Sequence, residues 1–425
     1  MMNIVELFSG IGSQVRALQN IGIETNVLGT CEWDIHASIA YDAIHNTESI
    51  SPNIEKMSKE DLLEKLKGYT LSNNGKEAMK FSTLKAYPLE ILRRVYASIV
   101  NSNNFVDVNS LTGEAMPKTV DLLTYSFPCQ DLSNVGAFHG YNKGIDKGSG
   151  SRSSLLWQVG RILQEMKDDH KRLPRFLLME NVPSLLSDRH LKNFEVWIKD
   201  LEELGYISKY FRLNACDFGL PQNRPRLLMI SVWVGQNETR KRKVNEFFNS
   251  KDSKEIVADY KQSVFFHKKE IKDLLRINYK EKKYLQEAIE CNPNNTPSRK
   301  RIWDENPKLV LKGKVINPNF SMVRTITTKQ DRNPNSGNLY FAPSEKGKSS
   351  FRYLTPRECL LFMGFTDEDY ENIIKENNSL EGSRVLFPRD KIIRLAGNSI
   401  PVCLLEGIFY QIKQIDEQIV RKEQV

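Results

Sequence analysis

The stretch NIVELFSGIGSQVRALQNIG, residues 3–22, contains a short apolar run, a glycine loop and a helical pattern, in that order. NIVELF has the length of a strand, SGIGSQ is the loop, and VRALQNI has the apolar spacing of a helix. Gly22 comes next, and glycine commonly follows the end of a helix. The next apolar run, NVLGTCEW, reads as a second strand. Strand, loop, helix and strand in this order predict an α/β fold.

Three later runs are short and almost continuously apolar: VDLLTYSF (residues 120–127), PRFLLMENV (174–182) and RLLMISVWV (226–234). Such runs are typical of strands that are buried on both faces of a parallel sheet. The helical patterns SSLLWQVGRILQEM and KNFEVWIKDLEELGY lie between them. We therefore expect a doubly wound, mostly parallel, Rossmann-like sheet that binds ligands at the carboxyl ends of its strands.

The chain of 425 residues is too long for one ordinary core, so more than one domain is expected. After Gly235 the clear alternation of strand and helix stops. We expect a first domain at 1–235, a smaller and irregular second domain at 236–353, and a return segment at 354–425 that completes the first domain. A polar, mostly helical insertion at 57–118 has no purpose that can be read from its sequence.

The positive charge of the chain is regional. The net charge is +8, and residues 237–350 alone hold 25 Lys plus Arg against 14 Asp plus Glu. A basic segment attached to a slightly acidic remainder is typical of a module that binds a polyanion. A lysine-rich surface that is simply solvated is the alternative.

The cysteines and the apolar segments indicate the cellular compartment of the protein and whether it binds metal. No CxxC pair occurs, which argues against a zinc site and against a disulfide framework, so we expect no metal. No segment approaches the roughly 20 apolar residues that span a bilayer. We expect a soluble protein in a reducing, cytoplasmic compartment. The six cysteines are Cys31, Cys129, Cys216, Cys291, Cys359 and Cys403.

The first loop and the second strand predict a nucleoside site. The glycines at 10 and 12 allow backbone to approach a ligand, but Val15 breaks the dinucleotide pattern GxGxxG. Glu32 ends the second strand, where a carboxylate can accept hydrogen bonds from ribose hydroxyls, and Trp33 can stack on a purine. An adenosine-bearing cofactor is expected. An ordinary turn with an exposed acid remains the alternative.

A cysteine, a glutamate and two arginines follow or begin the central strands. Pro128 cannot continue a central strand, so it directs Cys129 to the carboxyl edge of the sheet, ahead of a loop rich in Gly and Ser. Glu180 ends the run LLMENV. Arg224 and Arg226 are two positions apart and therefore share a face of the incoming strand. A buried packing cysteine, an exposed strand end and a solvated arginine pair are the alternatives.

Taken in order, ELFSGIGSQ, CEW, SFPCQDLS, MENV, QNRPRLLMI, RYLTPRECLLFMGF and LAGNSIPV resemble the motifs of the bacterial and phage DNA (cytosine-5) methyltransferases of restriction-modification systems. The resemblance extends from Glu6 to Val402. It implies sequence-specific transfer of a methyl group from S-adenosylmethionine to carbon 5 of a cytosine that is flipped out of duplex DNA. It also implies a covalent cysteine adduct.

The resemblance assigns roles to the residues at the strand ends. Cys129 would be the nucleophilic thiolate, Glu180 would bond the ring nitrogen and amino group of cytosine, and Arg226 would hold its carbonyl oxygen. Arg224 would orient these groups. The implied cofactor-binding residues are Phe8, Gly10, Ile11, Gly12, Glu32, Trp33, Asp61, Pro128, Asn398 and Ser399. Glu6 stands where the family usually has aspartate, and Ser13 where it has a second glycine.

The resemblance makes the second domain the target-recognition domain, with Thr325-Ile326-Thr327 similar to a short Thr-Leu element of the family. Side chains around it would divide between phosphates and base edges. The implied DNA-binding residues are Ser133, Arg324, Thr325, Thr327, Lys329, Gln330 and Arg332.

Three other functions are alternatives to this interpretation. A transfer-RNA cytosine methyltransferase would share the scaffold, but the recognition segment here is long. A DNA-binding regulator without catalysis conflicts with the presence of Cys129, Glu180 and Arg226. A nicotinamide oxidoreductase conflicts with Val15. We expect double-stranded DNA as the partner, a monomer, and a restriction endonuclease as a genetic partner without physical contact.

Overall fold

The computed structural model describes residues 1–46, 50–128, 155–305, 308–311, 314–315, 322–330, 337–341, 345–380 and 384–420. The chain forms two compact units. Unit 1 comprises Met1–Leu213, Pro225–Phe265 and Leu405–Val425, and unit 2 comprises Asn214–Arg224 and Phe266–Leu404. These bounds differ from those drawn on the sequence, since residues 236–265 fall in unit 1 and residues 354–404 in unit 2. The functional division into catalytic and recognition domains stays a prediction.

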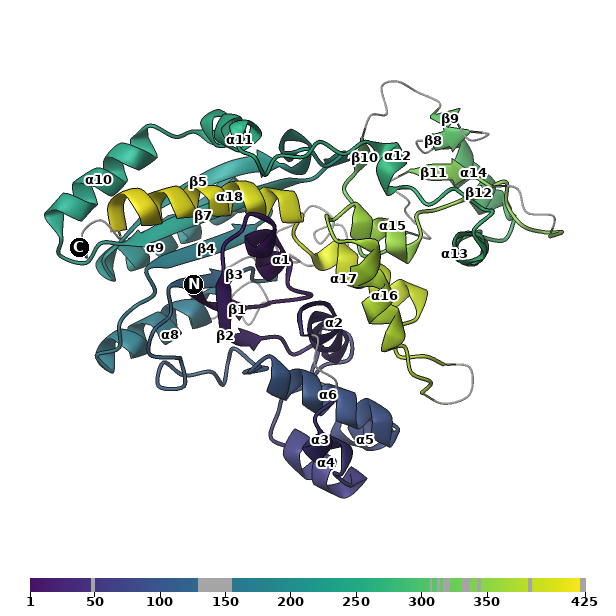
Figure 1. The fold of residues 1–425 in the computed structure, drawn as a ribbon, viewed down its shortest axis with the longest axis horizontal. Coiled ribbons are helices and arrows are strands. Elements are labelled where there is room, and N and C mark those ends of the chain that lie inside the picture. Colours follow the sequence, from purple (N-terminus) through teal and green to yellow (C-terminus); the bar gives the residue numbers. More distant parts are fainter. Residues whose placement is uncertain are drawn as a thin grey trace. The chain divides into compact units, whose positions relative to one another are not determined.

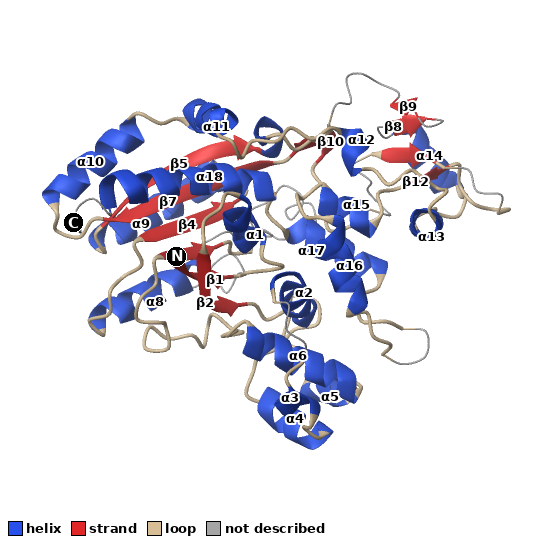
Figure 2. Cartoon of the chain, in the orientation of Figure 1, coloured by secondary structure: helices blue, strands red, loops and turns tan. Residues whose placement is uncertain are grey.

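Unit 1 is built on a six-stranded sheet with the order β2-β1-β3-β4-β7-β5 (Figures 1 and 2). Its first four strands pair in parallel, which confirms the α/β class and the mostly parallel sheet. The strands are β1 (Met2–Leu7), β2 (Thr25–Cys31), β3 (Leu122–Tyr125), β4 (Phe176–Asn181), β5 (Tyr206–Asn214) and β7 (Pro225–Trp233).

The direction of β7 differs from the prediction. RLLMISVWV was expected to run parallel with its neighbours, but β7 pairs with β4 in the antiparallel direction. An apolar run indicates burial on both faces and carries no information on direction, which explains the error. Strand β5, which lies at the sheet edge beside β7, was not among the predicted strands because it contains several polar residues.

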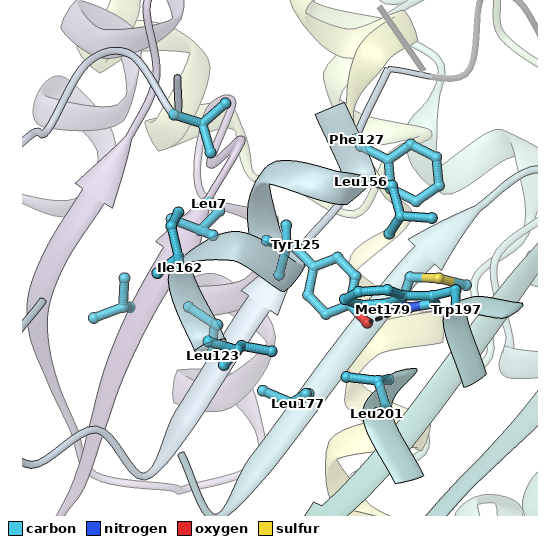
Figure 3. Close-up of a cluster of buried hydrophobic side chains, with 14 of the residues drawn as sticks. Leu7, Leu123, Tyr125, Phe127, Leu156, Ile162, Leu177, Met179, Trp197 and Leu201 are labelled. Carbon is cyan, nitrogen blue, oxygen red and sulfur yellow. Dashed lines mark hydrogen bonds between the residues drawn. The ribbon is translucent and has the colours of Figure 1, made fainter. Parts of the chain in front are cut away.

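Helices α8 and α9 pack on one face of this sheet. Leu123 and Tyr125 of β3 and Met179 of β4 contribute to a buried cluster that also contains Trp197 of α9 (Figure 3). The indole of Trp197 donates to the hydroxyl of Tyr125 at 3.2 Å, so neither polar group is buried without a partner. The helices of unit 1 are α1 (Ser13–Asn20), α2 (Ile35–His45), α3 (Pro52–Glu55), α4 (Lys59–Leu66), α5 (Phe81–Lys85), α6 (Leu89–Asn101), α8 (Leu156–Asp168), α9 (Asp188–Glu203), α10 (Glu238–Asn249), α11 (Ser253–Gln262) and most of α18 (Val402–Ile415), with short turns at Pro183–Leu186 and Asp416–Val420.

The insertion at 57–118 contains helices α4 to α6, and two of its segments lie beside the end of β2. Helix α6 packs against α2 and also against α3 and α4 (Figure 1). Ser72 donates its N–H to the carbonyl of Trp33 at 2.8 Å and accepts from the N–H of Ile35 at 2.9 Å. Asn104 forms a parallel bridge with Thr30. The insertion therefore supports the segment that follows β2.

Unit 2 contains a buried ion pair within the motif RYLTPRECLL. Arg352 donates to both oxygens of Glu358 at 2.7 and 2.8 Å, and both side chains are 0% exposed. Burial raises the pKa of Glu358, but the Arg352 charge and its hydrogen bonds outweigh this and hold it below the ordinary value. Thr355 caps the helix that contains Glu358. Residues of this motif therefore have a structural role, since they form a buried ion pair and cap a helix.

The secondary structure of unit 2 is mostly short. Its helices are the turn Ala215–Phe218, α12 (Ile271–Leu274), α13 (Lys282–Glu290), α14 (Pro297–Glu305), α15 (Pro356–Leu361), α16 (Asp367–Lys375) and α17 (Arg389–Asn398). Its strands are β6 (Gln222–Asn223), β8 (Lys308–Leu311), β9 (Lys314–Val315), β10 (Val323–Arg324), β11 (Asn338–Tyr340) and β12 (Phe351–Arg352).

One helical run in the described part of the chain, Arg389–Val420, is long and apolar enough to cross a membrane. Its most apolar window is 67% buried inside the protein. That burial is typical of a helix in a protein core.

Candidate active site

The loop after β1 has one open side and one packed side. Phe8, Gly10 and Gly12 have positive φ angles of 59°, 56° and 79°. A Cβ on Gly10 would meet nothing within 4 Å, so this position faces open space. A Cβ on Gly12 would collide with the side chains of His45 and Tyr41. The loop can therefore admit a ligand at Gly10, while Gly12 must remain glycine to keep its contact with α2.

Buried Glu6 and Tyr41 and half-buried His45 form the packed side. The hydroxyl of Tyr41 donates to Oε2 of Glu6 at 2.6 Å. Burial raises the pKa of Glu6 to about 7, against the opposing effect of the Tyr41 hydrogen bond. Nε2 of His45 donates to the carbonyl of Ile11 at 3.1 Å, and burial lowers the pKa of His45 to about 3, so this imidazole is neutral at physiological pH. His45 thus bonds the loop at Ile11, and Tyr41, which is bonded to Glu6, lies against Gly12.

Glu32 holds the open side of the loop in place. Its Oε2 accepts from the N–H of Gly10 at 3.1 Å and its Oε1 from the N–H of Asp34 at 2.8 Å. Asn104 fixes the main chain of Glu32 by hydrogen bonds of 3.0 and 2.9 Å. Trp33, the next residue, is half-buried. Because a carboxylate has about four acceptor sites, Glu32 can hold the loop and accept hydroxyl groups together.

Asp61 lies elsewhere, and the structure gives it another role. It is a fully exposed residue of the capping box of α4, where it accepts from the hydroxyl of Ser58 at 2.6 Å. Helix α6 packs against both α4 and α2, so the helix of Asp61 is in the outer layer of the insertion. The cofactor role of Asp61 stays a prediction, and its place in this capping box gives that role no support.

Asp107, in the part of the insertion that returns to the sheet, is a further acid close to the end of β2. The segment beginning at Asn104 runs beside β2, and the N–H of Phe105 donates to the carbonyl of Thr30 at 2.8 Å. After burial, the charges of Glu32 and Asp107 raise the pKa of Cys31, which places both carboxylates near this cysteine. Sequence reasoning missed Asp107 because it lies inside the unread insertion. The short run FVDV, ending beside a strand, was the available signal.

The end of β3 is fixed beside the end of β4. Nδ2 of Asn181 donates to the carbonyl of Phe127 at 3.1 Å, and the hydroxyl of Ser126 donates to the carbonyl of Phe8 at 3.4 Å. Pro128 is the last described residue of this segment. Cys129 and Ser133 lie outside the described residues. The chain nonetheless requires Cys129 to follow directly on this anchored strand end.

Glu180 and Arg226 form an ion pair on the sheet. Nε of Arg226 lies 2.9 Å from Oε1 of Glu180, and each side chain is 12% exposed. Arg226 also donates to the carbonyl of Pro225 at 2.7 Å. Two residues that were predicted separately at strand ends are therefore brought together. A paired carboxylate and guanidinium can bind the polar edge of a planar ring.

Arg224 has a different environment, in unit 2. Its guanidinium donates to the carbonyl oxygens of Ile326, Gly397 and Ser399 at 2.6, 2.8 and 2.9 Å. These three bonds are to main chain, and Arg224 is 1% exposed. We therefore treat it as a positioning residue. Asn398, expected at the cofactor with Ser399, is the last residue of α17, and the cofactor role of these two residues stays a prediction.

The candidate DNA-reading residues differ in exposure. Arg324 and Lys329 are exposed, whereas Gln330 is 1% exposed and donates to the carbonyl of Thr327 at 3.4 Å. Thr325 donates to the carbonyl of Asn223 at 2.8 Å, and Thr327 to that of Lys329 at 2.8 Å. Arg324 and Lys329 are therefore the accessible cations of this group. Arg332 lies outside the described residues.

No three His, Cys, Asp or Glu side chains among the described residues converge as metal ligands would. The groups found at the sheet edge are carboxylates paired with main-chain donors or with arginine. Their chemistry is that of hydrogen bonding and charge stabilisation.

Comparisons with known proteins show the family and the fold of the chain. The family described as C-5 cytosine-specific DNA methylase matches residues 89–414. The orphan methyltransferase M.SssI of Spiroplasma monobiae is 31% identical over 97% of this chain and 97% of its own length. The type II methyltransferase M2.ScrFI of Lactococcus lactis subsp. cremoris is 31% identical over 97% of this chain and 99% of its own. Among solved structures, the Dnmt2 methyltransferase of S. pombe is similar in fold, with a TM-score of 0.57 and 17% identity over 98% of this chain and 99% of that chain.

Proposed function

Because the chain belongs to the C-5 cytosine-specific DNA methylase family, we propose that it methylates carbon 5 of a flipped-out cytosine at a specific duplex site, with S-adenosylmethionine as the methyl donor. It is a DNA cytosine-5 methyltransferase of the restriction-modification type. The observation that carries the proposed mechanism is the ion pair of Glu180 and Arg226 next to the anchored strand that leads to Cys129.

The loop after β1 fits an adenosine-bearing cofactor. Gly10 faces open space and its N–H is held by Glu32, so a ligand beside Gly10 would meet this carboxylate. Glu32 would accept the ribose hydroxyls, Trp33 would cover the adenine, and Asp107 would accept from its amino group. Phe8, Ile11, Gly12 and Pro128 would line the rest of the site, together with Asn398 and Ser399. When bound, S-adenosylmethionine supplies an activated methyl group.

The residues at the strand ends would activate the target ring. Carbon 5 of cytosine is a poor nucleophile, and a bond from the sulfur of Cys129 to carbon 6 makes the ring behave as an enamine. Glu180 would bond the ring nitrogen and amino group, while Arg226 holds the carbonyl oxygen. Carbon 5 then takes the methyl group. A proton leaves carbon 5, for which we propose water as the acceptor, and the carbon–sulfur bond breaks.

Unit 2 would supply most of the DNA contacts. Residues 266–350, which belong to this unit, hold 18 Lys plus Arg against 9 Asp plus Glu. Helices α10 and α11, which precede these residues and belong to unit 1, carry a smaller excess of positive charge. Arg324 and Lys329 would contact phosphates or base edges, with Thr325, Thr327 and Gln330 shaping the loop. Ser133 and Arg332 would complete the interface.

The proposed setting is the cytoplasm, where DNA and a reducing environment occur together. We propose that the protein acts as a monomer. A restriction endonuclease of the same specificity would be a genetic partner without physical contact.

A methyl-transfer assay tests this function. Full-length protein with tritiated S-adenosylmethionine should label duplex DNA, and bisulfite sequencing should place the mark on one cytosine within a short fixed sequence. Cys129→Ser should retain cofactor binding and lose transfer. A parallel reaction with transfer RNA tests the RNA alternative. Labelling of transfer RNA alone would overturn the proposal.

A further inference from the structure

We propose that Arg224 is a positioning residue that couples recognition of the target site to cofactor binding, because it ties the recognition loop at 322–330 to the last turn of α17 and its C-cap, residues 397–399, called the turn below. The inference rests on the proposed function, since that function assigns DNA to the loop and the cofactor to the turn. All of the residues involved belong to unit 2.

The guanidinium of Arg224 is the centre of this arrangement. It bonds Ile326 of the recognition loop at 2.6 Å and, on the other side, Gly397 and Ser399 of the turn at 2.8 and 2.9 Å. The planar fork of an arginine fixes the direction of each bond, which the ammonium of a lysine would not do. With 1% exposure, these bonds are shielded from water. Loss of the side chain would leave carbonyl oxygens buried without this donor.

Neighbouring residues hold the same loop. Gln222 accepts from the N–H of Ile326 at 3.0 Å and donates to the carbonyl of Phe362 at 2.6 Å. Strand β6, which contains Gln222, pairs in parallel with β10 at the start of the loop. Thr325 adds a bond of 2.8 Å to the carbonyl of Asn223. The segment from Gln222 to Arg224 therefore fixes the loop at successive positions.

The loop also touches the turn directly. A Cβ added to Gly397 would lie 2.6 Å from the carbonyl carbon of Thr327 and 2.6 Å from the nitrogen of Thr328. Real Cβ atoms do not approach main chain so closely. The main chains of the loop and the turn are therefore in contact at Gly397, with Arg224 bonded to both.

Because Arg224 bonds both segments, ordering the recognition loop would also order the turn, and ordering the turn would order the loop. DNA bound to Arg324 and Lys329 would immobilise the loop, and through Arg224 it would immobilise Gly397 to Ser399. A turn that is already ordered loses less conformational entropy when it receives a ligand. By thermodynamic linkage, the cofactor must then tighten DNA binding by the same factor.

Calorimetry measures directly the factor by which DNA changes the affinity for the cofactor product. Calorimetry gives the Kd of S-adenosylhomocysteine for the full chain alone, with a duplex carrying the methylated site, and with a scrambled duplex. The ratio of the Kd without DNA to the Kd at saturating site duplex should be about 5- to 150-fold in the natural protein, the usual range of coupling. In Arg224→Gln the ratio should fall towards one.

Arg324→Gln is the matched control. Its side chain is exposed, so the change should weaken duplex binding and leave the ratio at saturating duplex as in the natural protein. If Arg224→Gln does not fold, Thr325→Val and Gly397→Ala test the same contacts and should lower the ratio. A ratio of one in the natural protein, or an unchanged ratio in a folded Arg224→Gln, would overturn the inference. Absence of methyl transfer by the natural protein would instead overturn the proposed function.

Discussion

Glu180 and Arg226 form a mostly buried ion pair between β4 and β7, which pair in the antiparallel direction, with Oε1 and Nε 2.9 Å apart. Because β7 runs against β4, the beginning of β7 lies beside the end of β4, which brings an incoming arginine to an outgoing glutamate. The pair therefore depends on the strand direction that the sequence did not reveal. A purely parallel sheet would have separated the two residues.

Glu180→Gln should lower kcat by about 10²- to 10⁴-fold, the usual contribution of a group that exchanges a proton or a strong hydrogen bond in the transition state. The amide can still bond to the ring edge, but it cannot transfer a proton to the ring nitrogen and carries no charge to pair with Arg226. Steady-state methyl-transfer kinetics measure the effect. Thermal unfolding is the control, since Arg226 loses its charged partner. An unchanged kcat would exclude Glu180 from the reaction.

Asp107→Asn should weaken the binding of S-adenosylhomocysteine by about 10- to 150-fold, as expected for roughly 1.5–3 kcal/mol of a charged hydrogen bond. Asp61→Asn is the matched variant in the same insertion and should leave this Kd unchanged, because Asp61 bonds within the capping box of α4. Calorimetry decides between them. The reverse order of effects would support the cofactor role of Asp61 instead.

Gly12→Ala and Gly10→Ala should affect different properties. Both positions have positive φ, so each alanine carries backbone strain of about 1–3 kcal/mol. At Gly12 the new Cβ would also collide with His45 and Tyr41, so Tm should fall further. At Gly10 the Cβ enters open space, so the main loss should be in cofactor Kd. Equal changes in Tm and Kd for the two variants would contradict the two-sided loop.

The stability of the protein should fall as pH rises through the titration of Glu6. Burial raises the pKa of Glu6 from 4.5 to about 7, so between these values the folded protein keeps a proton that the unfolded chain has released. Over this window the free energy of unfolding should decrease by about 3 kcal/mol and then level off. Glu6→Gln removes this contribution and keeps an acceptor for Tyr41. Urea unfolding of both proteins at pH 5 and pH 8 should show the difference; parallel pH dependences would refute it.

The parallel part of the fold and the first loop could be predicted from sequence because their signals are local. NIVELFSGIGSQ appears as β1, a loop of positive φ angles and α1, and Gly22 follows the helix with a φ of 66° as expected. Strand β5 was missed because its exposed residues interrupt the apolar pattern. The direction of β7 depends on pairing between distant segments, which apolar runs do not encode.

The candidate site was predictable where residue type and strand end coincide, as for Glu180 and Arg226. The capping-box role of Asp61 could not be predicted, because the position of an acid in the chain does not show which helix it caps. Arg224 shares a sequence motif with Arg226, yet its bonds go to main chain over a hundred residues later. Such partners are set by tertiary structure alone.

The most direct test of the central claim is the covalent trap. Duplex DNA with 5-fluorocytosine at the methylated position cannot lose a proton from carbon 5, so the bond between Cys129 and carbon 6 should persist. With S-adenosylmethionine present, the natural protein should give a denaturation-resistant complex, and mass spectrometry should locate the adduct on Cys129. Cys129→Ser should bind the duplex without forming it. A natural protein that binds and methylates ordinary site DNA yet forms no adduct, or forms it in Cys129→Ser, would contradict the mechanism.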